Sequence, residues 1–214
     1  HELDFGDRLH AVQHDSLNTE GKLYLKKIID SSRRMQQLID DLLTVSLIST
    51  QKTFVNYSLQ QIVQEVLNSL EYKIEEKKAR IFVDALPEAK IVPSQFRQLF
   101  QNLLSNSLKF VRSDKTPEIT IKANILKLWQ VSHYNLKSAS DYVEIKICDN
   151  GIGFEEAFSE QIFAIFQRLH SRSEYEGTGI GLAICKKIVE NHGGVIFANA
   201  KENQASVFTV IIPL

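Results

Sequence analysis

The most regular pattern of hydrophobic positions lies near the start of the sequence. Between residues 25 and 46, small or apolar side chains recur in alternating steps of three and four: Leu25, Ile28, Ser32, Met35, Ile39, Leu42 and Ser46. This spacing is that of a coiled-coil or helical-hairpin seam, and it predicts one helix of about 30 residues.

A shorter pattern precedes this helix. Phe5, Leu9 and Val12 share one helical face and end at the polar break of residues 15–18. We therefore expect a first helix that packs antiparallel to the second. The stripe of such a hairpin stays exposed unless a second copy covers it, so the pattern predicts half of a homodimeric four-helix bundle.

After the polar residues 49–52, short apolar segments alternate with amphipathic ones. They predict strands at 54–57, 80–86, 90–92, 118–131, 141–148, 195–198 and 206–212, and helices at 59–78, 94–111 (with Ser94 as N-cap) and 181–191. Strict β-α-β alternation is absent, so the predicted fold class is α+β. We expect a helical hairpin over residues 1–50 and a two-layer α/β sandwich with a mixed sheet over residues 51–214.

Composition narrows the classes of function. The 214 residues include 25 Lys and Arg against 26 Asp and Glu, without the basic excess of a nucleic-acid binder. No segment approaches the ~18 apolar residues of a membrane span, and residues 1–4 do not resemble a signal peptide. Cys148 and Cys185 lack metal-ligand spacing. We therefore expect a cytoplasmic fragment without contact to nucleic acid or membrane, whether or not its parent protein is membrane-anchored.

Three polar segments of the second region suggest chemistry. The first lies in the predicted helix 94–111, where Asn102, Asn106 and Lys109 share one face. Amides and an amine suit Mg²⁺ and phosphate, because Mg²⁺ takes few protein ligands and keeps phosphate oxygens as the others. An ordinary polar helix face is the alternative.

The other two segments contain paired glycines. Residues 149–154 (Asp-Asn-Gly-Ile-Gly-Phe) follow a strand, so the carboxylate of Asp149 can accept from a purine amino group, although a plain turn has the same composition. Residues 177–182 (Gly-Thr-Gly-Ile-Gly-Leu) precede a helix and offer backbone N–H groups to phosphate, but they are not a Walker loop. The long loop between them predicts a lid, from which Arg168 would meet a terminal phosphate.

Together these segments resemble the N, G1, F and G2 boxes of sensor histidine kinases, in the order of that family. Asn106 matches the N-box asparagine, residues 149–154 the first glycine box, residues 162–168 the F box and residues 177–182 the second glycine box. The helix around residues 24–43 resembles the second helix of the family's dimerisation and phosphotransfer hairpin. The resemblance therefore covers most of the chain.

The resemblance implies ATP and Mg²⁺ as cofactors. It implies Asn106 as the Mg²⁺ ligand, Asp149 as the acceptor for the adenine amino group, and Arg168 at the γ-phosphate. The remaining residues of the implied nucleotide site are Asn102, Lys109, Phe110, Gly151, Gly153, Gly177, Thr178, Gly179, Gly181 and Leu182. Related ATPases carry a water-activating glutamate at the position of Asn102. An amide cannot act as a base, so phosphoryl transfer to a protein fits better than hydrolysis.

The implied reaction moves the γ-phosphoryl group of ATP to a histidine and then to an aspartate of a response-regulator receiver domain, under an upstream sensor domain in the parent protein. His1-Glu2-Leu3 resembles the start of the acceptor motif, but its Pro-Leu is missing. Alignment of the second helix places the acceptor about two helical turns before residue 1, so we expect a truncated chain, with His1 as the alternative. A dimeric nucleotide-binding scaffold and a hydrolytic ATPase stay open as other functions.

Overall fold

The computed structural model describes residues 17–48, 53–112, 114–131, 134, 136, 141–169, 177–201 and 204–214. The contacts within the chain divide it into two units, His1–Thr44 and Val45–Leu214. The expected first helix, the acceptor candidate His1 and the predicted boundary at residues 49–52 lie outside the described residues.

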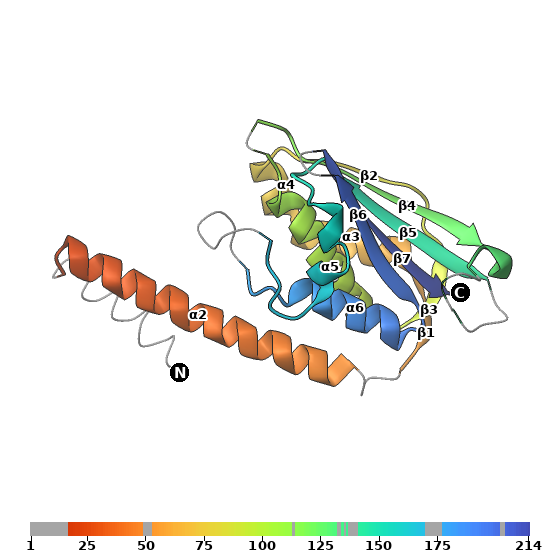
Figure 1. The fold of residues 1–214 in the computed structure, drawn as a ribbon, viewed down its shortest axis with the longest axis horizontal. Helices are drawn as coiled ribbons and strands as arrows, with labels where there is room; N and C mark the ends of the chain where they lie inside the picture. Colours follow the sequence, from red (N-terminus) through yellow and green to blue (C-terminus); the bar gives the residue numbers. More distant parts are fainter. Residues whose placement is uncertain are drawn as a thin grey trace. The chain divides into compact units, whose positions relative to one another are not determined.

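The long second helix is confirmed as α2, Thr19–Ile48, which is 30 residues long (Figure 1). The side chain of Asn18 accepts a hydrogen bond from the backbone N–H of Gly21 at 2.7 Å and so caps the first turn. Much of the predicted apolar stripe is exposed, including Ile28, Met35 and Ile39. Since exposed stripes of this kind need a partner, the helix has the surface expected of half a bundle.

The second unit contains a five-stranded sheet in the order β2-β4-β5-β7-β6. Strand β2 runs parallel to β4, and the other neighbours are antiparallel, so the predicted mixed sheet is confirmed. A separate pair joins β1 to β3. The strands are β1 Val55–Ser58, β2 Arg80–Val83, β3 Glu88–Ile91, β4 Glu118–Leu126, β5 Tyr142–Asp149, β6 Val195–Lys201 and β7 Ala205–Pro213.

Helices cover one face of this sheet (Figure 1). They are α3 Leu59–Ser69, α4 Glu71–Glu76, α5 Pro93–Lys109 and α6 Gly181–Asn191. Helix α5 lies between α3 and α6, and its fully buried Leu99, Leu103 and Leu104 form part of the core. This layer brings the C-terminal half of α5 next to the end of β5, where two of the predicted polar segments meet.

Two predictions about helices were wrong. Residues 59–78 form two helices, because the chain turns at the buried Leu70, whose backbone is not helical. Helix α5 begins at Pro93 after Val92, and Ser94 does not cap it. A proline fits the first helical position because the missing N–H would lack an intrahelical partner there in any case.

The last turn of α2 belongs to the second unit. The carbonyl of Ile48 accepts a hydrogen bond from Nε2 of Gln95 at 3.0 Å, and Oε1 of Gln95 accepts from the Asn191 amide at 3.0 Å. Gln95 is 4% exposed. A buried side chain from α5 thus supplies a partner to a helix-end carbonyl that would otherwise have none.

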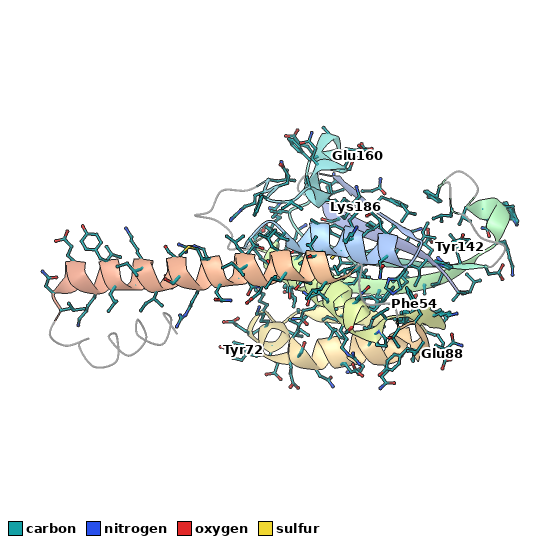
Figure 2. All side chains as sticks on the ribbon, turned by 90° about the horizontal axis from the view of Figure 1, so that it is seen from below. Phe54, Tyr72, Glu88, Tyr142, Glu160 and Lys186 are labelled. Carbon is teal, nitrogen blue, oxygen red and sulfur yellow. The ribbon has the colours of Figure 1, made fainter. Side chains whose placement is uncertain are left out.

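The histidine that closes α6 is part of the core. His192 packs edge-on against Phe54 (labelled in Figure 2) and Phe96, with ring centroids 4.9 Å away in both cases. Nε2 accepts from the backbone N–H of Val92 at 3.0 Å, and Nδ1 lies 2.7 Å from the Ile188 carbonyl, to which it must donate. Both ring nitrogens are therefore engaged, and burial lowers the pKa of His192.

Within the described part of the chain, no helix is both long and apolar enough to cross a membrane.

Candidate functional site

A buried carboxylate marks one end of the site. Asp149 ends β5 and is 7% exposed. Its Oδ2 accepts from the Ser107 hydroxyl at 3.2 Å, and its Oδ1 accepts from the backbone N–H of Gly151 at 3.0 Å. Burial raises the pKa of Asp149, while these donors oppose the rise. The fixed carboxylate offers acceptors only, as recognition of an amino group requires.

The glycine turn after Asp149 packs against the end of α5. The N–H of Ile152 donates to the carbonyl of Phe110 at 2.9 Å. A Cβ atom on Gly151 would lie 2.3 Å from that carbonyl oxygen, so only glycine permits this approach. The predicted residues Phe110, Asp149 and Gly151 are thus brought together. Gly153 also has a left-handed backbone, with φ 63°.

Two cations meet at the second glycine segment. The Arg168 guanidinium donates to the carbonyl of Gly177 at 2.7 Å. Nζ of Lys109 lies 4.2 Å from the centroid of the Phe110 ring and 3.1 Å from the position of a Cβ on Gly177. Lys109 ends α5 and Arg168 comes from the lid segment, so the fold joins positive charges from two distant segments, as phosphate binding needs.

Residues on the two sides of the predicted lid meet where the backbone is left-handed. Phe166 N–H donates to the Gly179 carbonyl at 3.0 Å, with φ 67° at Phe166 and 77° at Gly179. A Cβ on Gly179 would lie 3.1 Å from the Gln167 carbonyl oxygen. The oxygen of Thr178 is 3.4 Å from the N–H of Ile180. Residues 170–176 of the predicted lid lie outside the described residues.

The N-terminus of α6 follows directly. The predicted helix 181–191 is confirmed, and no side chain caps its first turn. The N–H groups at a helix start lack intrahelical partners and attract anions. Gly181 and Leu182 are half-buried at this end.

The two asparagines of α5 differ in their partners. The Asn102 amide donates to the carbonyl of Gly181 at 3.0 Å, and its oxygen accepts from Nε2 of Gln98 at 3.1 Å. The side chain of Asn106 makes no hydrogen bond to any described residue. Among those residues there is also no group of three or more His, Cys, Asp or Glu able to hold a metal ion. A hard cation here would rely on amide and phosphate oxygens.

Sequence reasoning did not identify Ser107. This hydroxyl lies on the buried face of α5 and donates to Asp149. One signal in the sequence could have identified it: helical spacing puts this small polar residue on the same face as Leu103, Leu104 and Leu108, which is the face expected to be buried.

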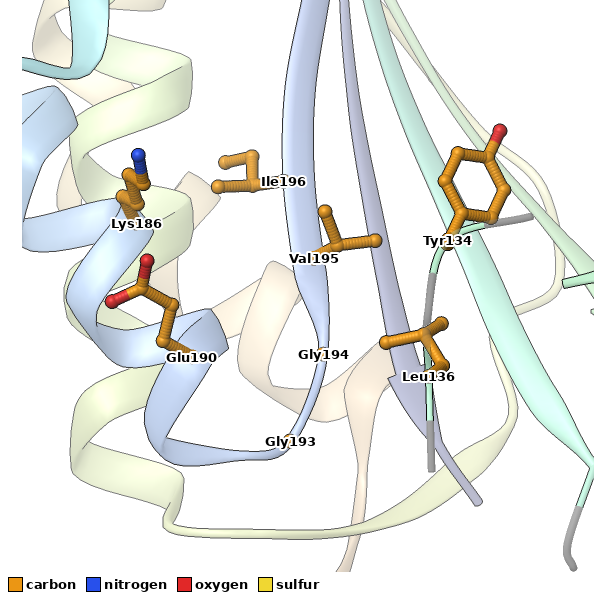
Figure 3. Close-up of a pocket in the computed structure, with 8 residues that line it drawn as sticks. All are labelled: Tyr134, Leu136, Lys186, Glu190, Gly193, Gly194, Val195 and Ile196. Atoms are coloured by element: carbon orange, nitrogen blue, oxygen red, sulfur yellow. The ribbon is translucent and has the colours of Figure 1, made fainter. Parts of the chain in front are cut away.

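A cavity of about 380 Å³ lies elsewhere, at the other end of α6. Figure 3 shows Lys186, Glu190 and Ile196 on one side of β6 and Val195, Tyr134 and Leu136 on the other. The strand divides the lining residues, and none of the predicted nucleotide residues is among them.

Comparisons with known proteins show the family of the chain. The family model described as "Histidine kinase-, DNA gyrase B-, and HSP90-like ATPase" matches residues 91–214. The chain is 38% identical over 201 residues to phytochrome-like protein Cph1 of Synechocystis sp., covering 94% of this chain and 25% of that protein. It thus spans about a quarter of the length of this curated relative.

Solved structures share the fold. Full-length ShkA in complex with AMPPNP has a TM-score of 0.69 at 18% identity, covering 98% of this chain and 44% of that one. Histidine kinase ThkA in complex with response regulator protein TrrA has a TM-score of 0.61 at 20% identity, covering 100% of this chain and 59% of that one. At these identities the likeness concerns the fold.

Proposed function

The chain belongs to the histidine kinase-, DNA gyrase B- and HSP90-like ATPase family, and from this we propose that it is the catalytic core of a sensor histidine kinase. In this proposal it binds Mg·ATP and transfers the γ-phosphoryl group to a histidine. The observation that carries the proposal is the convergence of Asp149, Lys109, Arg168 and Gly177 from four separated segments on one surface.

The buried end of the site recognises adenine. The Asp149 carboxylate accepts from the adenine amino group, and the bare backbone of Gly151 and Gly153 lets the ring approach. Ser107 and the N–H of Gly151 hold the carboxylate in place. A guanine or hypoxanthine ring presents a carbonyl oxygen at this position, which the carboxylate repels, so the site favours adenine.

The phosphates bind at the glycine segment. Lys109 and Arg168 supply positive charge, and Gly177, Thr178, Gly179, Gly181 and Leu182 supply backbone at the start of α6. Positioning and charge neutralisation carry most of a phosphoryl transfer, so these groups suit the chemistry. The bond from Arg168 to the Gly177 carbonyl supports a role of this guanidinium at the terminal phosphate.

The residues present fit Mg²⁺. Asn106 has a side-chain oxygen without a partner among the described residues, and Mg²⁺ commonly binds through few protein oxygens plus substrate phosphates. When bound, the ion would neutralise charge on the phosphate oxygens. Asn106 would hold it, while Lys109 and Arg168 would orient the phosphates.

Transfer to a protein nucleophile is favoured over hydrolysis, because the amide of Asn102 cannot remove a proton from water. In the proposed step a histidine nitrogen attacks the γ-phosphorus, the bond to the β-γ bridging oxygen breaks, and ADP leaves. The acceptor is a histidine upstream of residue 1, with His1 as the alternative. The phosphoryl group then passes to an aspartate of a receiver domain.

The proposed partners are a second copy of the chain, a receiver domain and an upstream sensor domain, with the cytoplasm as the compartment. The exposed stripe of α2 supports the homodimer, since Ile28, Met35 and Ile39 lie in water in the single chain. The solved complex of ThkA with a response regulator supports the receiver domain.

Mass spectrometry tests the reaction. A chain extended at its N-terminus by the preceding residues of the parent protein is incubated with Mg·ATP, and phosphorylated peptides are located after mild handling, since phosphohistidine is acid-labile. We expect one phosphohistidine in the first hairpin helix. Steady phosphate release without labelling would favour the hydrolytic ATPase, and nucleotide binding with neither outcome would favour the scaffold.

A further inference from the structure

Asn102 lies one helical turn before Asn106, the proposed Mg²⁺ ligand, and its contacts indicate a different role. Asn102 and Asn106 share a face of α5, yet only Asn102 is held by the protein at both ends of its amide. The Gly181 carbonyl is purely an acceptor, so the NH₂ end of Asn102 must face it. Gln98, one turn earlier on α5, then donates to the remaining oxygen.

The contact with Gly181 joins two helices at the phosphate end. Gly181 is the first residue of α6, and its Cβ position lies 3.6 Å from Cγ of Asn102, which is ordinary packing contact. The same amide also interacts with the thiol of Cys185, one turn into α6, where burial raises the thiol pKa to about 12 and Asn102 opposes the rise. Asn102 therefore holds the first turn of α6 against α5.

The first turn of α6 is the part that presents backbone N–H groups to the phosphates. No side chain caps that turn, and the Gly177–Gly179 segment leads straight into it. The direction of these N–H groups depends on the orientation of the helix end. A contact that fixes Gly181 thus fixes the donors that a polyphosphate would meet.

We propose that Asn102 is a positioning residue, which acts on the polyphosphate of the bound nucleotide through Gly181, with Gln98 holding its amide in the required orientation. It touches neither the metal ion nor the nucleotide. This inference rests on the proposed function and deepens it. It assigns the two asparagines of one helix face to separate tasks, metal binding by Asn106 and helix orientation by Asn102.

The substitution Asn102→Asp separates the two roles. A carboxylate is a better Mg²⁺ ligand than an amide, but it cannot donate to the Gly181 carbonyl and repels it. We expect about tenfold weaker binding of both ATP and ADP, the usual effect of losing one hydrogen bond. Adenosine binding and the Mg²⁺ concentration that half-saturates ATP binding should stay as in the wild type.

Gln98→Ala provides a milder second variant, which leaves the donor to Gly181 in place and removes its support. It should weaken ATP binding less than Asn102→Asp does. Hydrogen exchange should be faster at the amides of residues 184 and 185, the first that are bonded within α6, in both variants, with thermal unfolding recorded as a check of folding. Asn106→Asp is the matched variant on the same face, and it should instead change the Mg²⁺ dependence.

The outcomes are distinct. Unchanged ATP affinity in Asn102→Asp, or a shift in its Mg²⁺ dependence, would overturn the positioning role. An equal loss for adenosine and ATP would also overturn it, because it would show general damage to the site. Failure of the proposed function has another signature, namely that the wild-type chain and its Asp149→Asn variant bind ATP equally.

Discussion

The two ends of the proposed nucleotide site are built differently. At the adenine end, Asp149 is buried at the end of a central strand and Ser107 comes from a core helix, so packing of the sheet against α5 fixes both. At the phosphate end, Gly177 and Gly179 lie in a loop with positive φ angles, and Arg168 donates to the backbone carbonyl of Gly177. Core packing thus holds the adenine end, whereas the glycines and the arginine of the phosphate end come from loop segments.

This difference separates the interactions that recognise the base from those that serve the reaction. A base of fixed shape is best recognised by groups that the core holds in place, because little ordering entropy is lost on binding. The phosphates must rearrange during transfer, so a loop with local hydrogen bonds suits them. Substitutions at the two ends should therefore differ in both stability and ligand dependence.

The largest effect is expected for Gly151→Ala. The added Cβ would lie 2.3 Å from the Phe110 carbonyl oxygen and 2.7 Å from Oδ1 of Asp149, so the turn must move away from α5. Overpacking of this kind costs about 1–3 kcal/mol of unfolding free energy. ATP binding measured by calorimetry should be lost, and urea unfolding should show the stability cost.

Gly181→Ala is the comparison for stability, since its Cβ meets Asn102 only at 3.6 Å. Its unfolding free energy should stay level or rise by about 0.4–1 kcal/mol, because alanine restricts the unfolded chain. A Gly151→Ala protein as stable as the wild type would contradict the tight packing at the adenine end.

The next effect is that of Asp149→Asn. The amide can still accept from Gly151 and can donate to the oxygen of Ser107, but it presents a donor where adenine also has one. A hydrogen bond to a charged group contributes about 1.5–3 kcal/mol, so ATP affinity should fall by about 10–100-fold. Stability at pH 7 should not fall, because burial raises the pKa of Asp149 and the variant removes that cost of ionisation.

Asp141→Asn is the matched control for Asp149→Asn. It removes the same charge just before the other end of β5, where Asp141 pairs with Lys127 at 2.6 Å on the surface. Its ATP affinity should equal that of the wild type. Equal losses in the two variants would show a general effect of charge and contradict adenine recognition by Asp149.

A smaller effect on ATP binding is expected from a substitution at the phosphate end, compared with a similar substitution away from the site. Gly179→Ala and Gly193→Ala each place a side chain on a left-handed residue, with φ 77° and 68°. That conformation costs about 1–2 kcal/mol in both. Gly179→Ala should lose at least as much stability as Gly193→Ala, because its Cβ also lies 3.1 Å from the Gln167 carbonyl oxygen. ATP binding should weaken by about tenfold only in Gly179→Ala, where the strain lies beside the predicted lid, while adenosine binding is unchanged. Similar ATP affinity in the two variants would contradict a role of Gly179 in phosphate binding.

The smallest effect is expected from the titration of His192, at the C-terminal end of α6. Burial lowers the pKa of His192 below its ordinary 6.5, and protonation would remove the acceptor for the Val92 N–H. The unfolded chain takes up this proton first as the pH falls. Neutral His192 therefore contributes fully to the free energy of unfolding above pH 6.5. As the pH falls below 6.5 this contribution declines, until the pH has passed the pKa of His192 in the folded chain.

Urea unfolding at pH 7, 6 and 5 measures this decline. The variant His192→Gln should be less stable at pH 7 but should show a flatter pH dependence than the wild type. An identical slope in the two proteins would mean that His192 does not titrate differently on folding.

The sequence pattern predicted the long helix, the mixed sheet and the helix from Gly181 to Asn191, because hydrophobic period and glycine position report local structure directly. It did not predict the break at Leu70, since no proline or glycine interrupts that segment and the burial of Leu70 follows from tertiary packing. Nor did it place the start of α5, where Ser94 resembles a cap but Pro93 is the first residue.

The candidate site followed from motifs more than from geometry. The motifs identified Asp149, Lys109 and Arg168, but the contacts of Ser107 with Asp149 and of Asn102 with Gly181 join residues 42 and 79 positions apart. Pairings of this kind depend on how helices pack on the sheet, and no local pattern in the sequence reports them.

The most direct test is the choice between ATP and inosine triphosphate, which replaces the adenine amino group with a carbonyl oxygen. Calorimetric titration of the wild-type chain should show ATP binding at least about tenfold more tightly. In Asp149→Asn the preference should shrink or reverse, because the new amide donates to the carbonyl oxygen. Equal binding of the two nucleotides by the wild type, or an unchanged preference in the variant, would contradict adenine recognition by the buried carboxylate.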